Sequence, residues 1–125
     1  MVAIGSRPAP TLLRRGDIHL VTFEDIGGSV LRGPHPAVIV QTERLAQSST
    51  VLVCPMTSRG GRQPDAVPPY LVWVPRKDSG LDRDGWLKAD QVFTRPVDLL
   101  GPKLGRLAPG ALARVDASLR FVLAL

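Results

Sequence analysis

The sequence contains few of the residues from which disulfides and metal centres are built. Cys54 is the one cysteine among 125 residues, which excludes an internal disulfide and a zinc site made of cysteines. It lies in an apolar run without a neighbour that would lower its pKa, so we interpret it as a small buried hydrophobe. His19 and His35 are the two histidines, and no carboxylates accompany them at a metal-site spacing. We therefore expect no metal and no cofactor, and we interpret His19, within a strand segment, as structural.

Long apolar runs and generic catalytic motifs are also absent. No segment approaches the roughly 18 uninterrupted apolar residues of a membrane span, and residues 1–13 lack the apolar core of a signal peptide. The chain has no P-loop, no dinucleotide-binding glycine fingerprint, no HExxH and no CxxC. We expect a cytoplasmic protein without a membrane partner.

Acidic residues are fewer than basic ones. The chain has 16 lysines and arginines against 11 aspartates and glutamates, a formal net charge of +5, and its pI is about 10.3. This balance favours a polyanionic partner. Because the basic residues are scattered along the sequence, a binding surface has to be assembled by folding.

The length of the chain predicts one domain, at residues 14–125, after a flexible arm at residues 1–13. We expect short strands at 17–23, 37–41, 50–55, 70–74 and 86–89, a continuation past a turn at 90–94, and brief strands at 97–100 and 103–107. The runs at 37–41 and 50–55 are almost continuously apolar, which indicates burial on both faces.

The last segment has the period of a helix. Pro109 suits its first turn, and apolar residues then recur at steps of three and four: Leu112, Val115, Leu119, Val122 and Leu123. The pattern predicts a helix of about 15 residues, with Asp116 and Arg120 paired on its polar side. Many short strands and one closing helix predict a mainly β fold with α, a small barrel with a C-terminal helix.

We interpret the stretch Gly33-Pro34-His35-Pro36 as a rigid turn that leads into the strand at 37–41. The flanking prolines restrict His35 to an extended backbone, so its ring is aimed in one direction. A second apolar run ends in Thr57 and Arg59, and we expect that end to meet His35. The alternatives are a plain turn histidine and a threonine that simply ends a strand.

Arg32, Arg59 and Arg62 lie in loops that flank the two inner strands. Each one alone suits an ordinary solvated surface, but a cluster of three is better explained by phosphate contact. Trp73 and Trp86 suit the core of a small protein better than base stacking.

Several short motifs, in this order along the chain, resemble the MazF/PemK family of toxin endoribonucleases. They are RGDI, GS, PAVIV, CPMT and DGWLKADQV, at residues 15–18, 28–29, 36–40, 54–57 and 84–92. The resemblance covers nearly the whole chain after the N-terminal arm. It implies an SH3-like barrel of the CcdB/PemK type with a C-terminal helix, a homodimer, and the toxin's part in a type II toxin–antitoxin system.

The resemblance also implies an activity and a partner. The activity is that of an mRNA interferase, which cleaves single-stranded RNA at short sequences without a metal and leaves 2′,3′-cyclic phosphate and 5′-hydroxyl ends. The partner is a MazE-like antitoxin whose disordered acidic tail covers the RNA groove.

Members of the family usually carry an arginine just before the proline of the second strand and a threonine at the end of the third. Thr57 matches the threonine, but His35 stands in place of the arginine, and Val30-Leu31 replace a Glu-Gln pair. Histidine, with an ordinary pKa of about 6.5, exchanges protons near neutral pH more readily than arginine but carries no permanent charge. The hypothesis is that His35 is the general acid or base, Thr57 donates a hydrogen bond to the phosphate, and Arg32 or Arg59 supplies the missing charge. Further contacts to RNA are expected from Arg59, Arg62, Arg76, Lys77 and Lys88.

Two other hypotheses remain open. One is a catalytically weak module that holds RNA on the same barrel, and the other is a CcdB-like toxin that inhibits DNA gyrase. Fragments of RNA on a gel would separate the enzyme from both.

Overall fold

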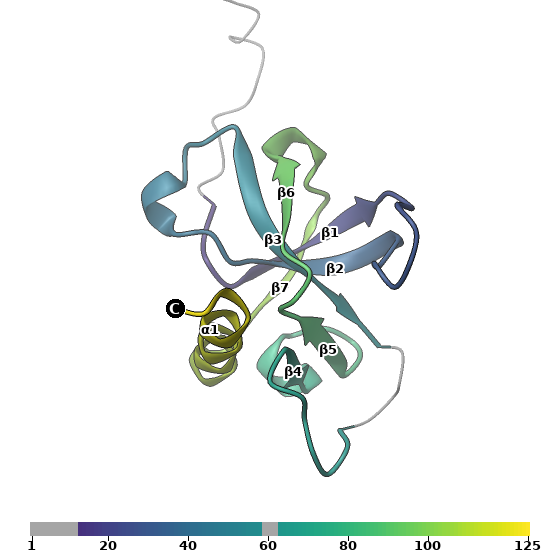
Figure 1. Ribbon diagram of the computed structural model, residues 1–125. Helices are drawn as coiled ribbons and strands as arrows, with labels where there is room; N and C mark the ends of the chain where they lie inside the picture. Colours follow the sequence, from purple (N-terminus) through teal and green to yellow (C-terminus); the bar gives the residue numbers. More distant parts are fainter. Residues whose placement is uncertain (1–12, 59–62) are drawn as a thin grey trace, which may run out of the picture.

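The computed structural model of the protein describes residues 13–58 and 63–125 (Figure 1). Within them the strands are β1 (Asp17–Phe23), β2 (Gly33–Ile39), β3 (Thr50–Thr57), β4 (Leu71–Val74), β5 (Gly85–Lys88), β6 (Phe93–Pro96) and β7 (Lys103–Arg106). The helices are the short 3-10 turns η2 (Glu43–Leu45), η3 (Arg76–Asp78) and η4 (Val97–Leu99) and the longer α1 (Pro109–Leu123).

The strands form a curled sheet of antiparallel neighbours in the order β4-β5-β3-β2-β1-β7. Strand β3 is long enough to serve two partners on one side: residues 50–53 pair with β6, and Met56 and Thr57 pair with β5. The sheet bends at this change of partner (Figure 1). The end of β3 is therefore held by β5, just beyond the part of β3 that pairs with β2.

The segment after β4 closes the barrel against β7. The amide of Arg106 donates to the carbonyl of Ser79 at 3.0 Å, and the amide of Ala108 donates to the carbonyl of Asp78 at 2.7 Å. A Cβ atom at Gly105 would lie 2.2 Å from the Ser79 oxygen, so this approach requires a glycine. The mainly β fold with a C-terminal helix, predicted as a small barrel, is confirmed.

Apolar side chains cover both faces of the central strands. On one face Val38, Cys54 and Met56 belong to a buried cluster that includes Ala111 and Val115 of α1. On the other face a second cluster gathers Val21, Phe23, Ala37, Ile39, Val51 and Val53. The alternation follows from the period of two in a strand. The structure confirms burial on both sides for most of the runs in β2 and β3; Leu52 of β3 is an exception, at 37% exposed.

Helix α1 begins at Pro109 and spans 15 residues, as the sequence predicts. Val115 is fully buried, and Leu112, Leu119 and Val122 pack against the first cluster. Leu123, expected on the same face, is 54% exposed because it lies in the last turn, before Ala124 ends the helix in the left-handed conformation.

The structure corrects three other expectations. Asp116 forms an ion pair with Arg15 at 2.6 Å, from the loop before β1, in place of the expected pair with Arg120. Residues 97–99 form a 3-10 turn, not a strand, because the amide of Leu100 bonds back to the carbonyl of Val97.

The third correction concerns the stretch before residue 37. The segment Gly33–Ile39 is all strand, so the expected turn at residues 33–36 is wrong. Pairing with β1 sets Pro34 against Thr22 and His35 against Val21. Pairing with β3 begins only at Ala37, beyond both prolines, so their missing N–H groups leave that ladder intact.

Candidate functional site

His35 and Thr57 occupy facing ends of neighbouring strands. In the antiparallel register Ala37 pairs with Pro55, and two further residues along each strand bring His35 opposite Thr57. Both side chains line the same two cavities. The expectation that these two strand ends meet is confirmed.

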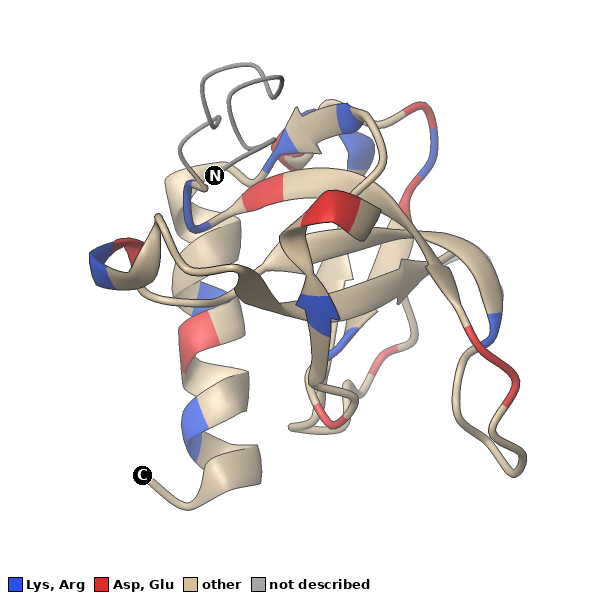
Figure 2. Ribbon diagram, turned by 90° about the horizontal axis from the view of Figure 1, so that it is seen from above, with Lys and Arg blue, Asp and Glu red and all other residues tan. Residues whose placement is uncertain are grey.

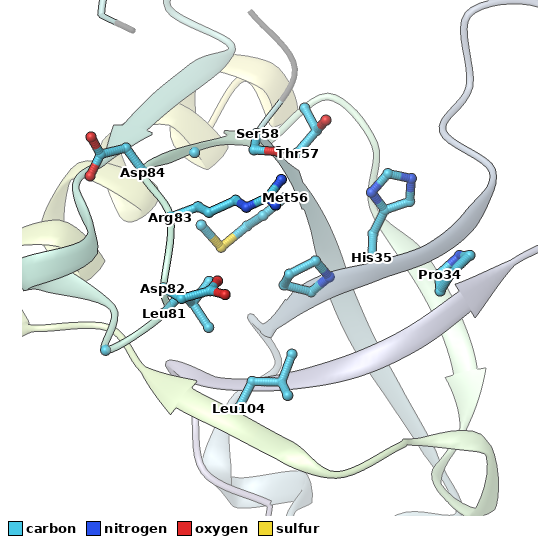
Figure 3. A pocket seen from close by; sticks show the side chains of 13 residues that line it. Pro34, His35, Met56, Thr57, Ser58, Leu81, Asp82, Arg83, Asp84 and Leu104 are labelled. Atoms are coloured by element: carbon cyan, nitrogen blue, oxygen red, sulfur yellow. The ribbon is translucent and has the colours of Figure 1, made fainter. Parts of the chain in front are cut away.

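The first cavity, of about 510 Å³, lies between these strand ends and the loop that leads into β5. Its wall includes Asp82, Arg83 and Asp84. Figure 3 shows the Arg83 side chain extending into the cavity, toward the side where Thr57 and His35 lie. The Asp84 carboxylate accepts a hydrogen bond from the amide of Arg76 at 2.8 Å, which fixes the loop at its far end.

The second cavity, of about 740 Å³, opens on the other side of the same pair. The loop between β1 and β2 forms one wall, ending at Arg32, and Trp86 and Lys88 of β5 form another. Arg32 and Lys88, both predicted from the sequence, are therefore brought together with His35 and Thr57.

The half-buried ring of His35 is held by its own backbone neighbourhood. Its Nε2 atom lies 2.8 Å from the carbonyl oxygen of Arg32, and its ring centroid lies 6.4 Å from that of Phe23. A carbonyl oxygen only accepts hydrogen bonds, so Nε2 carries the hydrogen. Nδ1 is then the nitrogen that can take up a proton.

The side chain of Arg32 makes a longer contact than its backbone carbonyl does. Its Nε atom lies 3.8 Å from Asp25, and the two side chains are 60% and 66% exposed. An ion pair this long and this exposed is weak. The guanidinium of Arg32 is thus able to turn toward an anion in the second cavity.

A sequence model described as "PemK-like, MazF-like toxin of type II toxin-antitoxin system" matches residues 14–123. The chain belongs to the PemK/MazF family.

Solved structures of PemK/MazF relatives share the fold. MazF from Deinococcus radiodurans superposes with a TM-score of 0.73 at 20% identity, covering 92% of this chain and 99% of that one. A mycobacterial endoribonuclease in complex with its cognate antitoxin gives 0.67 at 23% identity, covering 89% and 94%. The Mycobacterium tuberculosis toxin MazF-mt6 gives 0.68 at 20% identity, covering 87% and 97%.

Of the other basic residues predicted to contact RNA, Arg76 and Lys77 lie away from these two cavities of the PemK/MazF chain. Arg76 is exposed in η3 and lines neither cavity. Lys77 lines a separate cavity beside α1, together with Arg114 and Phe121. Arg59 and Arg62 lie outside the described residues. Figure 2 shows basic and acidic positions interspersed over the barrel and α1.

Sequence reasoning missed two residues of the site. Arg83, in the loop between β4 and β5, lines the first cavity because β5 pairs with the end of β3. Gln91, in the DGWLKADQV motif at residues 84–92, bonds to the backbone of the loop before β2. The motif itself was the signal for Gln91, whereas nothing in the sequence distinguished Arg83.

The residues interpreted as structural behave as such. Burial raises the pKa of the Cys54 thiol to about 12, which excludes it as a nucleophile near neutral pH. His19 Nδ1 lies 3.0 Å from the carbonyl of Gly101. Trp73 and Trp86 pack edge to face with centroids 4.9 Å apart, and Trp86 is buried.

Neither a metal-binding cluster nor a membrane-spanning helix is found in the described residues. Across 13–58 and 63–125, no three His, Cys, Asp or Glu side chains are grouped so that they could hold a metal ion. No helix in the same ranges has the length and apolar character of a membrane span.

Proposed function

We propose that this PemK/MazF protein is the toxin of a type II toxin–antitoxin pair and acts as an endoribonuclease on single-stranded RNA. The observation that carries the proposal is the facing pair of His35 and Thr57, which lines two cavities at once. An RNA strand passing from one cavity to the other would bring a phosphate between them. MazF-mt6 and the mycobacterial endoribonuclease are relatives of the same fold.

The proposed reaction is attack by the 2′-hydroxyl on the neighbouring phosphorus. The proton leaves the 2′-oxygen for a base, the O2′–P bond forms, and the P–O5′ bond breaks as the 5′-oxygen takes up a proton. His35, with Nδ1 available, is the group able to exchange a proton in this reaction. The products are a 2′,3′-cyclic phosphate and a 5′-hydroxyl end, and no metal takes part.

The phosphorane oxygens need hydrogen-bond donors and positive charge. Thr57 supplies a hydroxyl at the boundary of the two cavities. Because histidine replaces the arginine usual in this family, the charge has to come from other residues. We propose that it comes from Arg83, which lines the first cavity, and from Arg32 and Lys88, which line the second.

The proposed partners are an acidic antitoxin and a second copy of the chain. The mycobacterial relative was solved with its cognate antitoxin, and MazF of D. radiodurans with MazE. A formal charge of +5 suits an acidic tail that competes with RNA. Self-association is supported by apolar side chains exposed at the end of α1, with Phe121 at 60%, Leu123 at 54% and Leu125 at 85%. We propose that the toxin and its antitoxin act in the cytoplasm.

The test is incubation of purified protein with a long single-stranded RNA in EDTA, followed by electrophoresis. Discrete fragments are expected at short recurring sequences. Binding without cleavage, weakened steeply by salt, would instead indicate an RNA-holding module. Inhibition of gyrase supercoiling with intact RNA would indicate a CcdB-like toxin.

A further inference from the structure

We infer that Gln91 is a positioning residue for His35. It holds the loop between β1 and β2 so that the carbonyl of Arg32 keeps the hydrogen of the imidazole on Nε2 and leaves Nδ1 for proton exchange. The inference rests on the proposed function for its catalytic meaning, but the geometry it describes is testable in the protein alone.

The side-chain amide of Gln91 bonds to the loop through both of its ends. Its Oε1 accepts from the amide of Leu31 at 2.9 Å, and its Nε2 donates to the carbonyl of Ser29 at 3.2 Å. Gln91 itself lies in the turn after β5, where its backbone amide donates to the carbonyl of Lys88 at 3.2 Å. These two side-chain hydrogen bonds, which we call the clamp, join the loop between β1 and β2 to the turn after β5, the strand that forms one wall of the second cavity.

The loop needs such a clamp because its own sequence favours many conformations. Gly27, Gly28 and Gly33 all have positive φ, at 90°, 62° and 82°, and most of the loop is exposed. Its internal contacts are a bond from the amide of Gly27 to Asp25 at 3.0 Å and the long Arg32–Asp25 pair. Ordering a glycine-rich segment costs conformational entropy, and the two bonds from Gln91 offset part of that cost.

The clamp binds the residue next to the one whose carbonyl contacts His35. Leu31, whose amide is bound by Gln91, immediately precedes Arg32, whose carbonyl lies 2.8 Å from His35 Nε2. In a neutral imidazole, the hydrogen bond made by one nitrogen decides which nitrogen carries the hydrogen. Without the clamp, the Arg32 carbonyl is free to turn away and both tautomers of His35 become accessible.

Two substitutions separate this role from simple loop packing. Gln91→Leu has a similar volume and removes both hydrogen bonds, whereas Gln91→Glu keeps the acceptor for the Leu31 amide and loses the donor to Ser29. Gln47→Leu is the matched control, because Gln47 is exposed and lines a cavity on another part of the barrel.

The first readout is the tautomer of the two histidines, from long-range ¹H–¹⁵N spectra of the full chain without RNA. In the parent protein His35 is expected as the Nε2–H form. His19 is expected as the Nδ1–H form in every variant, because its Nδ1 faces the Gly101 carbonyl. Gln91→Leu is expected to give a mixture at His35, Gln91→Glu a smaller change, and Gln47→Leu none.

The second readout is cleavage kinetics. Gln91→Leu is expected to lower kcat by about 10- to 100-fold with little change in KM, since the catalytic group is misplaced and the binding surface is kept. An unchanged Nε2–H signal in Gln91→Leu overturns the inference, as does an unchanged kcat beside a mixed tautomer. If Gln91→Leu does not fold, Gln91→Glu decides by the same two readouts. If the parent protein cleaves no RNA, the proposed function fails, and the spectra still decide whether Gln91 positions His35.

Discussion

His35 lies opposite Thr57 at the end of the β2–β3 ladder, two residues beyond the pair Ala37–Pro55. Beneath them the two strands are packed on both faces, so the ends are carried on a rigid base. Past Ala37 the strands are no longer paired with each other, and both side chains reach the cavities. A rigid support with an open end is what a site needs to hold a phosphate in a fixed position.

Removing either side chain is expected to reduce RNA cleavage without unfolding the protein. His35→Ala should lower kcat by at least about 100-fold if a proton is transferred by this ring. Thr57→Val, which keeps the shape and removes the hydroxyl, should lower it by about 10- to 100-fold. Thr94→Val, at an exposed position on β6, is the matched control. Full activity in His35→Ala would eliminate His35 as a catalytic group.

Arg83 is expected to contact the RNA backbone. Binding of a non-cleavable 2′-deoxy substrate by Arg83→Ala should be weaker, and the slope of log K against log salt should be shallower by about 0.7 for one lost phosphate contact. Arg44→Ala, exposed in η2 away from both cavities, should leave the slope unchanged. Equal slopes for the two variants would remove Arg83 from the site.

Because the Cys54 thiol is buried, the free energy of unfolding depends on pH in the alkaline range. Its pKa rises from 9.0 to about 12 on folding because burial penalises the thiolate. Unfolding therefore releases a proton above pH 9, and the free energy of unfolding falls as pH rises through the interval from 9 to about 12. Near pH 10.5 the loss from this group is about 2 kcal/mol.

Urea denaturation of Cys54→Ala at about pH 8 and about pH 10.5 isolates this effect, since the other titrating groups are shared. The variant should be less stable than the parent at the lower pH, because it leaves a cavity. It should lose less stability between the two pH values, and an equal loss in both proteins would contradict the burial of Cys54.

The closure of the barrel depends on Gly105. Gly105→Ala sets a Cβ atom 2.2 Å from the Ser79 carbonyl, so about 1–3 kcal/mol of unfolding free energy should be lost. Gly110→Ala, in the first turn of α1 with nothing within 4 Å, should be neutral or stabilise by up to about 1 kcal/mol. Thermal or urea unfolding of both variants checks this, and a Gly105→Ala protein as stable as Gly110→Ala would contradict the close approach.

The sequence predicted the elements whose pattern is local. Strand β1 and helix α1 have the expected ranges because hydrophobic period and flanking glycine or proline define them. The start of β2 was mistaken for a turn, because prolines alone indicate a turn and only pairing with β1 makes the segment a strand. The 3-10 turn at Val97–Leu99 was likewise predicted as a strand, because its residues are mostly apolar.

The residues of the candidate site also differ in whether a local sequence pattern predicts them. His35 and Thr57 were predicted to meet because they end two neighbouring strands of a hairpin. Arg83 and Gln91 come from the region around β5, and only the pairing of β5 with the end of β3 brings that region to the site. Such a contact depends on how the sheet curls, which spacing along the chain does not encode.

The most direct test of the proposed activity is the chemistry of the RNA ends. A defined single-stranded RNA, cleaved by the full chain in EDTA, is analysed by mass spectrometry and by labelling of the 5′ ends. The account predicts 2′,3′-cyclic phosphates and free 5′-hydroxyls, with the cleavage lost in His35→Ala. Ends that carry a 3′-hydroxyl and a 5′-phosphate would contradict attack by the 2′-hydroxyl, and with it the roles given to His35 and Thr57.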